Sequence, residues 1–135
     1  MLDEALDVNN LQVDEFTSVC LVEAGTDDMI KDLLEIMQEK GVRHLPVKED
    51  GQVVGIVSER DIYCLRYKPW WDELKARDVM TKDPFVVQSK ALLREVVYEM
   101  STRKIGSALV SDENGKVFGI FTSIDALNAL IEVLQ

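Results

Sequence analysis

The heptapeptide GIVSERD at residues 55–61 returns as GIFTSID at residues 119–125. Both copies place a glycine, two apolar residues, a hydroxyl residue and an aspartate at matching positions, and Gly119 follows Gly55 by 119 − 55 = 64 positions. Upstream, GVRHLPV at 41–47 matches KIGSALV at 104–110 with an offset of 110 − 47 = 63, so one residue is inserted near Asn114. An internal repeat of this length predicts two copies of one structural unit.

Each copy has the pattern strand, helix, strand, strand, helix. The first strands are predicted at CLV (20–22) and FVV (85–87). An apolar stripe at helical spacing then runs from Met29 to Met37, with Gly41 as its cap, and a second runs from Leu92 to Met100. Turn signals, EDG (49–51) and DENG (112–115), join the next two strands. The fold class is therefore α/β of mixed type: two β-α-β-β-α repeats about a pseudo-twofold axis, with helices packed on mixed sheets.

Four segments follow from this pattern. Residues 1–17 form an acidic lead-in, residues 18–67 the first repeat, residues 68–75 (KPWWDELK) a connector and residues 76–135 the second repeat. In the connector, we expect one of Trp70 and Trp71 to pack in the core and the other to stay partly exposed. A role of these aromatic residues in a protein interface is the alternative.

Composition excludes several classes of protein. The formal net charge of −10 opposes broad attraction to DNA or RNA, although a small anionic ligand can still be held by a local cluster of donors. No apolar run approaches the roughly 20 residues that span a bilayer, and the first residues show no charged-then-apolar leader before a cleavage site, so we expect a soluble protein. The two cysteines have no CxxC spacing, so we expect a reduced, cytoplasmic protein, and the context IYCLR predicts that Cys64 is buried.

The order of elements, the repeated G-h-h-S/T-x-x-D (h apolar), and the stretches GVRHLPVKEDGQVVGIVSERDI (41–62) and ARDVMTKDPFVV (76–87) resemble a tandem pair of CBS domains, the Bateman module. The resemblance covers about residues 13–135. It implies a regulatory module that binds AMP, ADP, ATP or S-adenosylmethionine in clefts between the repeats, with no required cofactor. It further implies that Asp61 and Asp125 hold ribose hydroxyls and that Ser58 and Thr122 contact phosphate. Adenine would be flanked by Val22, Val87, Val42 and Ile105.

The residue types suit these roles. A carboxylate accepts two charge-assisted hydrogen bonds from a vicinal diol. A hydroxyl just before a helix lies beside free N–H groups that attract anions. A glycine three residues earlier lets a ligand or another backbone approach closely. The alternative is structural, because S-E-R-D and T-S-I-D both resemble a helix capping box, and a duplicated fold duplicates its caps.

Charge distinguishes the two copies. Arg43, His44 and Arg60 offer a local positive patch for phosphate, and a half-exposed strand position is the alternative for His44. Their counterparts Gly106, Ser107 and Ile124 carry no charge, and Arg103 and Lys104 replace them only in part. The two sites are therefore predicted to differ in affinity.

No nucleophile elbow, P-loop or HExxH motif is present, and a single histidine excludes a His-rich metal site, so we expect no catalysis and no bound metal. We expect a ligand-sensing module that signals to an effector protein by a conformational shift, and the resemblance to tandem CBS domains implies that it is a homodimer. The rival hypothesis is a scaffolding module with degenerate clefts. Such a module would associate through helix faces and the Trp70–Trp71 connector.

Overall fold

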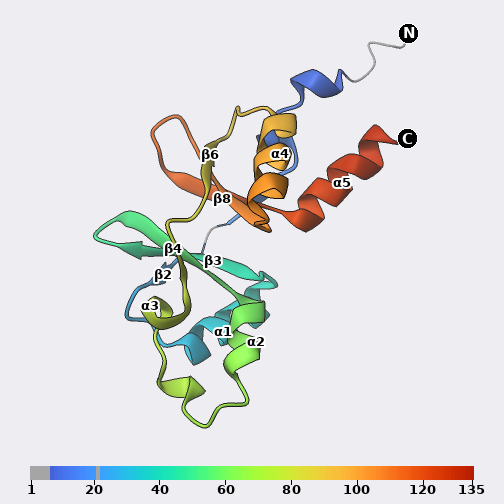
Figure 1. Ribbon diagram of the computed structural model, residues 1–135. Helices are drawn as coiled ribbons and strands as arrows, with labels where there is room; N and C mark the ends of the chain where they lie inside the picture. The colour runs from blue at the N-terminus through green and yellow to red at the C-terminus, as the bar shows by residue number, and fades with distance from the viewer. Residues whose placement is uncertain (1–6, 21) are drawn as a thin grey trace. The chain divides into compact units, whose positions relative to one another are not determined.

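The computed structural model describes residues 7–20 and 22–135, which form two compact units (Figure 1). Of these residues, unit 1 comprises 7–20 and 85–135, and unit 2 comprises 22–84. Each unit contains a four-stranded mixed sheet with helices packed against it. The predicted mixed α/β fold with two related repeats is thereby confirmed.

Unit 2 has the strand order β2-β3-β4-β5. β2 (Ala24–Gly25) runs parallel to β3 (His44–Glu49), while β4 (Gln52–Ser58) is antiparallel to both β3 and β5 (Thr81–Lys82). The crossover from β2 to β3 passes through α1 (Ile30–Lys40), and α2 (Glu59–Leu65) and α3 (Ala76–Val79) complete the unit. Figure 1 shows α1 and α2 together beside the β3–β4 hairpin. The core joins helix and strand side chains: Ala24, Ile30, Leu33, Leu34, Met37, Leu45, Val47, Val57, Ile62 and Ala76.

Unit 1 repeats this plan with the order β1-β8-β7-β6. β6 (Val86–Gln88) runs parallel to β7 (Ser107–Ser111), and β8 (Val117–Thr122) is antiparallel to β7 and to β1 (Ser18–Val19). The helices are α4 (Leu93–Arg103) and α5 (Ser123–Val133). The core is made mainly of helix and strand side chains, to which the segment before β1 adds Leu11: Leu11, Val13, Leu93, Val96, Met100, Ala108, Val110, Phe121 and Ala129.

Turns and helix ends follow the local sequence. Gly41 caps α1 in the left-handed region at φ 67°, as predicted. Lys104 adopts the same conformation after α4 at φ 57°, a position that glycine commonly fills. In the second hairpin, Asp112 Oδ1 accepts the N–H groups of Asn114 and Lys116, both at 2.9 Å, which organises the longer loop that holds the inserted residue.

Two short segments, which we call the leading segments, each come just before one of the two repeats in the sequence. Each of them packs in the unit formed by the other repeat. The first (8–19) packs in unit 1 and the second (71–82) in unit 2. We call residues 22–67 the first body and residues 85–133 the second body. Leu11 and Val13 of the first leading segment are only 6% and 0% exposed, so these residues belong to a core. The predicted repeat boundaries remain a proposal about the sequence, because the compact units divide the chain differently.

The two leading segments pack through equivalent hydrogen bonds. Val13 N donates to Ala91 O at 2.9 Å in unit 1, and Ala76 N donates to Asp28 O at 2.8 Å in unit 2. The two donor residues are 76 − 13 = 63 positions apart in the sequence, and the two acceptor residues are also 91 − 28 = 63 positions apart. The sequence similarity of LQVDEFTSV (11–19) to LKARDVMTK (74–82) is weak, so the hydrogen bonds rather than the residue types show that these stretches are equivalent.

Two expectations were wrong. Cys20 and Val22 lie outside any strand, and Leu21 lies outside the described residues; the chain passes from unit 1 to unit 2 at this point. Cys64 is exposed rather than buried. In the seven-residue α2 only Ile62 is buried, and a residue two positions later lies on nearly the opposite side of a helix.

The tryptophan pair behaves as predicted. Trp71 is half-buried and packs against the core of unit 2, whereas Trp70 is 45% exposed. The Arg66 guanidinium lies over the ring of Trp71 at 5.8 Å and over that of Tyr63 at 5.7 Å. These contacts fix the connector on the end of α2.

Candidate functional site

The repeated motif ends a strand and starts a helix in each unit. Ser58 closes β4 and is the N-cap of α2, and Thr122 closes β8 and is the N-cap of α5. Each hydroxyl accepts the backbone N–H of the aspartate three residues later, Asp61 at 3.1 Å and Asp125 at 3.4 Å. Both hydroxyls therefore act as helix caps, as the structural alternative predicted.

The motif glycines are required by a neighbouring strand. A Cβ on Gly55 would lie 2.6 Å from Met80 Sδ and 2.9 Å from Thr81 O. A Cβ on Gly119 would lie 2.5 Å from Thr17 Cγ2 and 2.9 Å from Ser18 O. Of the two explanations for these glycines, close approach of another backbone is therefore the one that the structure supports.

In unit 1 the Asp125 carboxylate is held inside its own helix cap. Asp125 Oδ2 accepts the Thr122 backbone N–H at 2.9 Å and the Thr122 hydroxyl at 3.2 Å. Asp125 Oδ1 accepts the hydroxyl of Ser18, from β1, at 3.3 Å. A half-buried carboxylate with both oxygens engaged has little capacity left for a diol.

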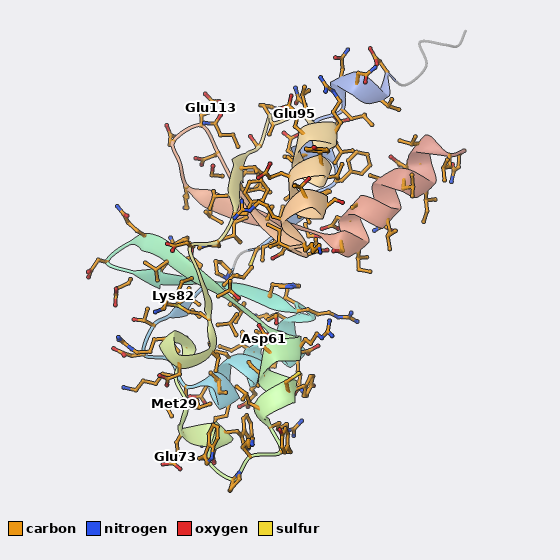
Figure 2. The ribbon with its side chains drawn as sticks, in the orientation of Figure 1. Met29, Asp61, Glu73, Lys82, Glu95 and Glu113 are labelled. Atoms are coloured by element: carbon orange, nitrogen blue, oxygen red, sulfur yellow. The ribbon has the colours of Figure 1, made fainter. Side chains whose placement is uncertain are left out.

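In unit 2 the equivalent carboxylate is available. Asp61 is exposed at the first turn of α2, where Figure 2 labels it. Its backbone N–H bonds to Ser58, but within residues 7–20 and 22–135 its carboxylate accepts no hydrogen bond and forms no ion pair. One motif thus supplies a closed capping box in unit 1 and an open carboxylate in unit 2.

Three basic residues, Arg43, His44 and Arg60, lie at the same corner of unit 2. His44 is half-buried and pairs with Ser58 across β3 and β4, and the Arg43 carbonyl accepts the Glu59 N–H at 2.8 Å. Arg43 and Arg60 are exposed, and neither forms an ion pair with any residue that the structure describes. Because α2 has only seven residues, its dipole is short, and charge at this corner comes from side chains.

The equivalent corner of unit 1 has no basic residue at the three matching positions. The Gly106 carbonyl accepts both the backbone N–H of Ser123 at 3.0 Å and its hydroxyl at 3.3 Å. Ser107 pairs with Thr122, and Ile124 is 59% exposed. The charge difference that the sequence predicts is thus present at two equivalent strand–helix corners.

The apolar candidates are partly used by the cores. Val22 and Val42 are half-buried and pack against the core of unit 2, and Val87 and Ile105 do the same in unit 1. Each retains some exposed surface beside its own sheet. Their role toward a base stays a prediction.

The described part of the chain holds neither a metal-site cluster nor a membrane-spanning helix. No group of three or more His, Cys, Asp or Glu side chains is arranged to hold a metal ion. No helix there has both the length and the apolar character needed to cross a membrane.

Comparison with known proteins gives a family match in both halves. A family model described as CBS domain matches residues 14–65 and 76–132. An inosine-5′-monophosphate dehydrogenase of Korarchaeum cryptofilum is 30% identical over 105 residues, which are 78% of this chain and 21% of that protein. An uncharacterized protein of Methanocaldococcus jannaschii is 30% identical over 125 residues, 91% of this chain and 45% of that protein. The chain therefore spans less than half the length of these two curated relatives.

Solved structures with the same fold include two with ligands. The structure of CBSX2 in complex with AMP is 27% identical with a TM-score of 0.73, and the match covers 92% of this chain and 98% of that one. The CBS domain pair of protein MJ0100, in complex with 5′-methylthioadenosine and S-adenosyl-L-methionine, has a TM-score of 0.78 at 23% identity. That match covers 93% of this chain and 98% of the other, and it shows similarity of fold.

Proposed function

We propose, on the premise that the chain belongs to the CBS domain family, that it is a non-catalytic regulatory module whose unit 2 binds an adenosine compound. One observation carries the proposal: the open Asp61 carboxylate lies at the same corner as Ser58, Arg43, His44 and Arg60. A ligand with a diol at one end and negative charge at the other matches this set. The complex of the similar CBSX2 with AMP supports an adenosine nucleotide as that ligand.

Each side chain has a distinct task in this account. Asp61 accepts two hydrogen bonds from the ribose hydroxyls. The Ser58 hydroxyl accepts from the Asp61 N–H and keeps its own proton to donate to a phosphate oxygen. Arg43 and Arg60 neutralise phosphate charge, and His44 contacts the phosphate. The exposed parts of Val22 and Val42 offer apolar surface to the base.

Unit 1 is proposed to bind the same ligand more weakly. Asp125 would have to release the Ser18 and Thr122 hydroxyls before it could accept a diol. Its corner also lacks the arginines of unit 2. The apolar residues Val87 and Ile105 would then contribute more than charge does.

Signalling to a partner requires that the ligand bind two states of the protein with different affinities. Binding shifts the population toward the state with higher affinity, and the shift is limited by the ratio of the two affinities. An effector protein that recognises one of these states would receive the signal. AMP, ADP, ATP and S-adenosylmethionine all carry the adenosine group that this site recognises.

The test is thermal unfolding of the purified protein with millimolar AMP, ADP, ATP, S-adenosylmethionine or NADH, with GMP and GTP as controls. A ligand that binds only the folded state raises the midpoint according to RT ln(1 + [L]/Kd). We expect a rise with at least one adenosine compound and a smaller one with its guanosine counterpart. No rise with any of them would favour a scaffolding role.

A second function, self-association, is favoured by the surface of α5. Ile124, Leu127, Ile131 and Leu134 are 59%, 54%, 56% and 75% exposed. Their spacing of three or four residues places them along one side of the helix. We propose that this stripe, called the α5 stripe, buries itself against a second copy of the chain to form a homodimer.

A further inference from the structure

Two ion pairs occupy equivalent places in the two units, with their charges reversed. In unit 1, Lys90 of the second body binds Asp14 of the first leading segment, with Nζ to Oδ2 at 3.0 Å. In unit 2, Asp27 of the first body binds Arg77 of the second leading segment, with Nε to Oδ1 at 3.1 Å. Both partners are offset by the same interval, 90 − 27 = 63 and 77 − 14 = 63.

The positions are equivalent in the backbone as well as in number. Asp14 N donates to Ser89 O at 3.1 Å, and Arg77 N donates to Thr26 O at 3.0 Å. Thr26 and Ser89 directly precede Asp27 and Lys90. Each ion pair therefore joins a leading segment to a body at the same point of the same packing arrangement.

Exchange of the two leading segments would turn both attractions into repulsions. If the first leading segment packed on the first body, Asp14 would occupy the place of Arg77 and face Asp27. If the second packed on the second body, Arg77 would face Lys90. Like charges at contact distance disfavour the wrong partner even where right pairs add little stability.

The backbone and apolar contacts of the leading segments do not distinguish the two segments by charge. Leu11 and Leu74 occupy equivalent positions, and both are leucine. The Leu11 carbonyl accepts the Leu93 N–H at 2.8 Å, and the Leu74 carbonyl accepts the Ile30 N–H at 3.0 Å. Val13 and Ala76 are both fully buried and differ in size. In unit 2, Lys75 adds to the positive side, with Nζ 3.8 Å from Asp27 Oδ1. The Arg77 guanidinium also donates to Thr26 Oγ1 at 3.4 Å.

We propose that the reversed ion pairs sort the two leading segments, so that each body accepts only the segment of this chain that carries the opposite charge. The two packing arrangements otherwise share equivalent backbone hydrogen bonds and a leucine at the same position. Sorting by charge prevents the protein from forming the alternative topology in which each body takes the segment that precedes it.

The test measures which of two cysteines forms a disulfide with a third cysteine when the protein refolds. Ser18 pairs with Ile120 in unit 1, and in the alternative packing residue 18 would take the place of Thr81 opposite Ile56. The full chain carries Ser18→Cys, Ile56→Cys and Ile120→Cys, with Cys20→Ser and Cys64→Ser to remove the native thiols. It is refolded under oxidising conditions at low ionic strength, and the monomeric product is mapped by mass spectrometry for the 18–120 and 18–56 disulfides.

Charge variants with unchanged net charge then test the sorting. With native charges we expect the 18–120 disulfide to predominate. Asp27→Lys with Lys90→Asp is expected to move the ratio toward 18–56 by about tenfold, from the combined loss of attraction and gain of repulsion at both sites. Adding Asp14→Arg and Arg77→Asp is expected to restore the native ratio. The shift should shrink near 1 M salt, where the Debye length is about 3 Å.

Two results would overturn the proposal. One is an unchanged disulfide ratio in the Asp27→Lys, Lys90→Asp variant, even if its thermal stability falls, since the pairs would then only fasten a topology set by the chain connection. The other concerns Asp27→Asn with Lys90→Gln, which contains no repulsive pair and should fold. We expect an intermediate ratio there, and a fully native ratio would contradict sorting.

Discussion

The backbone N–H of Thr122 donates a 2.9 Å hydrogen bond to the carboxylate of Asp125, and the Thr122 hydroxyl accepts the Asp125 N–H in return. The equivalent pair in unit 2 makes only the second of these bonds. The same motif therefore forms both capping hydrogen bonds in unit 1. In unit 2 it forms only the bond to the serine hydroxyl, and the Asp61 carboxylate stays open. This difference separates structural from ligand-binding roles that the sequence assigns equally to both copies.

The reciprocal cap predicts unequal losses of stability. Asp125→Ala removes hydrogen bonds to Thr122 and Ser18 and is expected to lower the free energy of unfolding by about 1 kcal/mol. Asp61→Ala removes none from its carboxylate and is expected to change the free energy of unfolding by less than about 0.5 kcal/mol. Urea denaturation measures both, and a larger loss for Asp61→Ala would contradict the assignment.

The positive corner of unit 2 predicts a dependence on phosphate. Arg43→Gly and Arg60→Ile install the residues found at the equivalent positions of unit 1. We expect each to weaken ATP binding by about tenfold at low salt, because a hydrogen bond to a charged group contributes about 1.5–3 kcal/mol. Adenosine is the matched control ligand, and an equal loss for adenosine would show that the arginines do not read phosphate.

Close packing at the motif glycines predicts a structural cost. Gly55→Ala and Gly119→Ala place a methyl group against backbone oxygens 2.9 Å away, and each is expected to lower stability by about 1–3 kcal/mol. Gly106→Ala is the matched control, because its Cβ would meet only Ser123 Oγ at 3.4 Å. Thermal unfolding that ranks Gly106→Ala with the other two would argue against the strand contact as the cause.

The Asp27–Arg77 pair predicts a dependence on acid. The hydrogen bond and positive charge of Arg77 lower the pKa of Asp27 below its ordinary value. A carboxyl with a lowered pKa in the folded state contributes stability above its unfolded pKa, near 3.9, and loses it as the pH falls through the folded value. Wild type should therefore be more stable than Asp27→Asn at pH 7, by a small amount because the pair is exposed.

The same comparison made between pH 7 and pH 2.5 supplies the control. The difference in urea midpoint between wild type and Asp27→Asn should shrink steadily below about pH 4. A difference that stays constant with pH would mean that the substitution acts through packing rather than through the charge of Asp27.

The α5 stripe predicts a change in oligomeric state. Leu127→Arg and Ile131→Glu are expected to raise the dissociation constant of the dimer by at least about tenfold, since each puts a charge in an apolar contact. Tyr98→Arg on α4 is the control, because Tyr98 is also exposed, at 71%. Sedimentation velocity measures the effect, and a wild-type protein that remains a monomer at high concentration would contradict the homodimer.

The sequence identified the repeats because their signals are local. The turn at Asp50 and Gly51, the cap at Gly41 and the hydroxyl before each helix follow from rules about neighbouring residues. The split of Trp70 and Trp71 also follows from their adjacency. The fold class and both capping motifs were therefore predictable from the chain alone.

The predictions that were wrong or incomplete depend on how the elements pack, which the neighbouring residues do not show. Residues 1–17 were interpreted as a lead-in because the partners of residues such as Val13 lie far along the chain, as in the bond from Val13 N to Ala91 O, 91 − 13 = 78 positions away. Cys64 was expected to be buried because its neighbours are apolar, but the short α2 buries only one side. The inequality of Asp61 and Asp125 arises from side-chain hydrogen bonds, including one from Ser18, that the motif does not encode.

The most direct test of the central claim is calorimetric titration of AMP into wild type, Asp61→Asn and Asp125→Asn under identical conditions. We predict that Asp61→Asn weakens the tighter binding event by about tenfold or more, while Asp125→Asn leaves that event within about twofold of wild type. Equal affinities in all three proteins, or a loss confined to Asp125→Asn, would contradict the assignment of the ligand to the open carboxylate of unit 2.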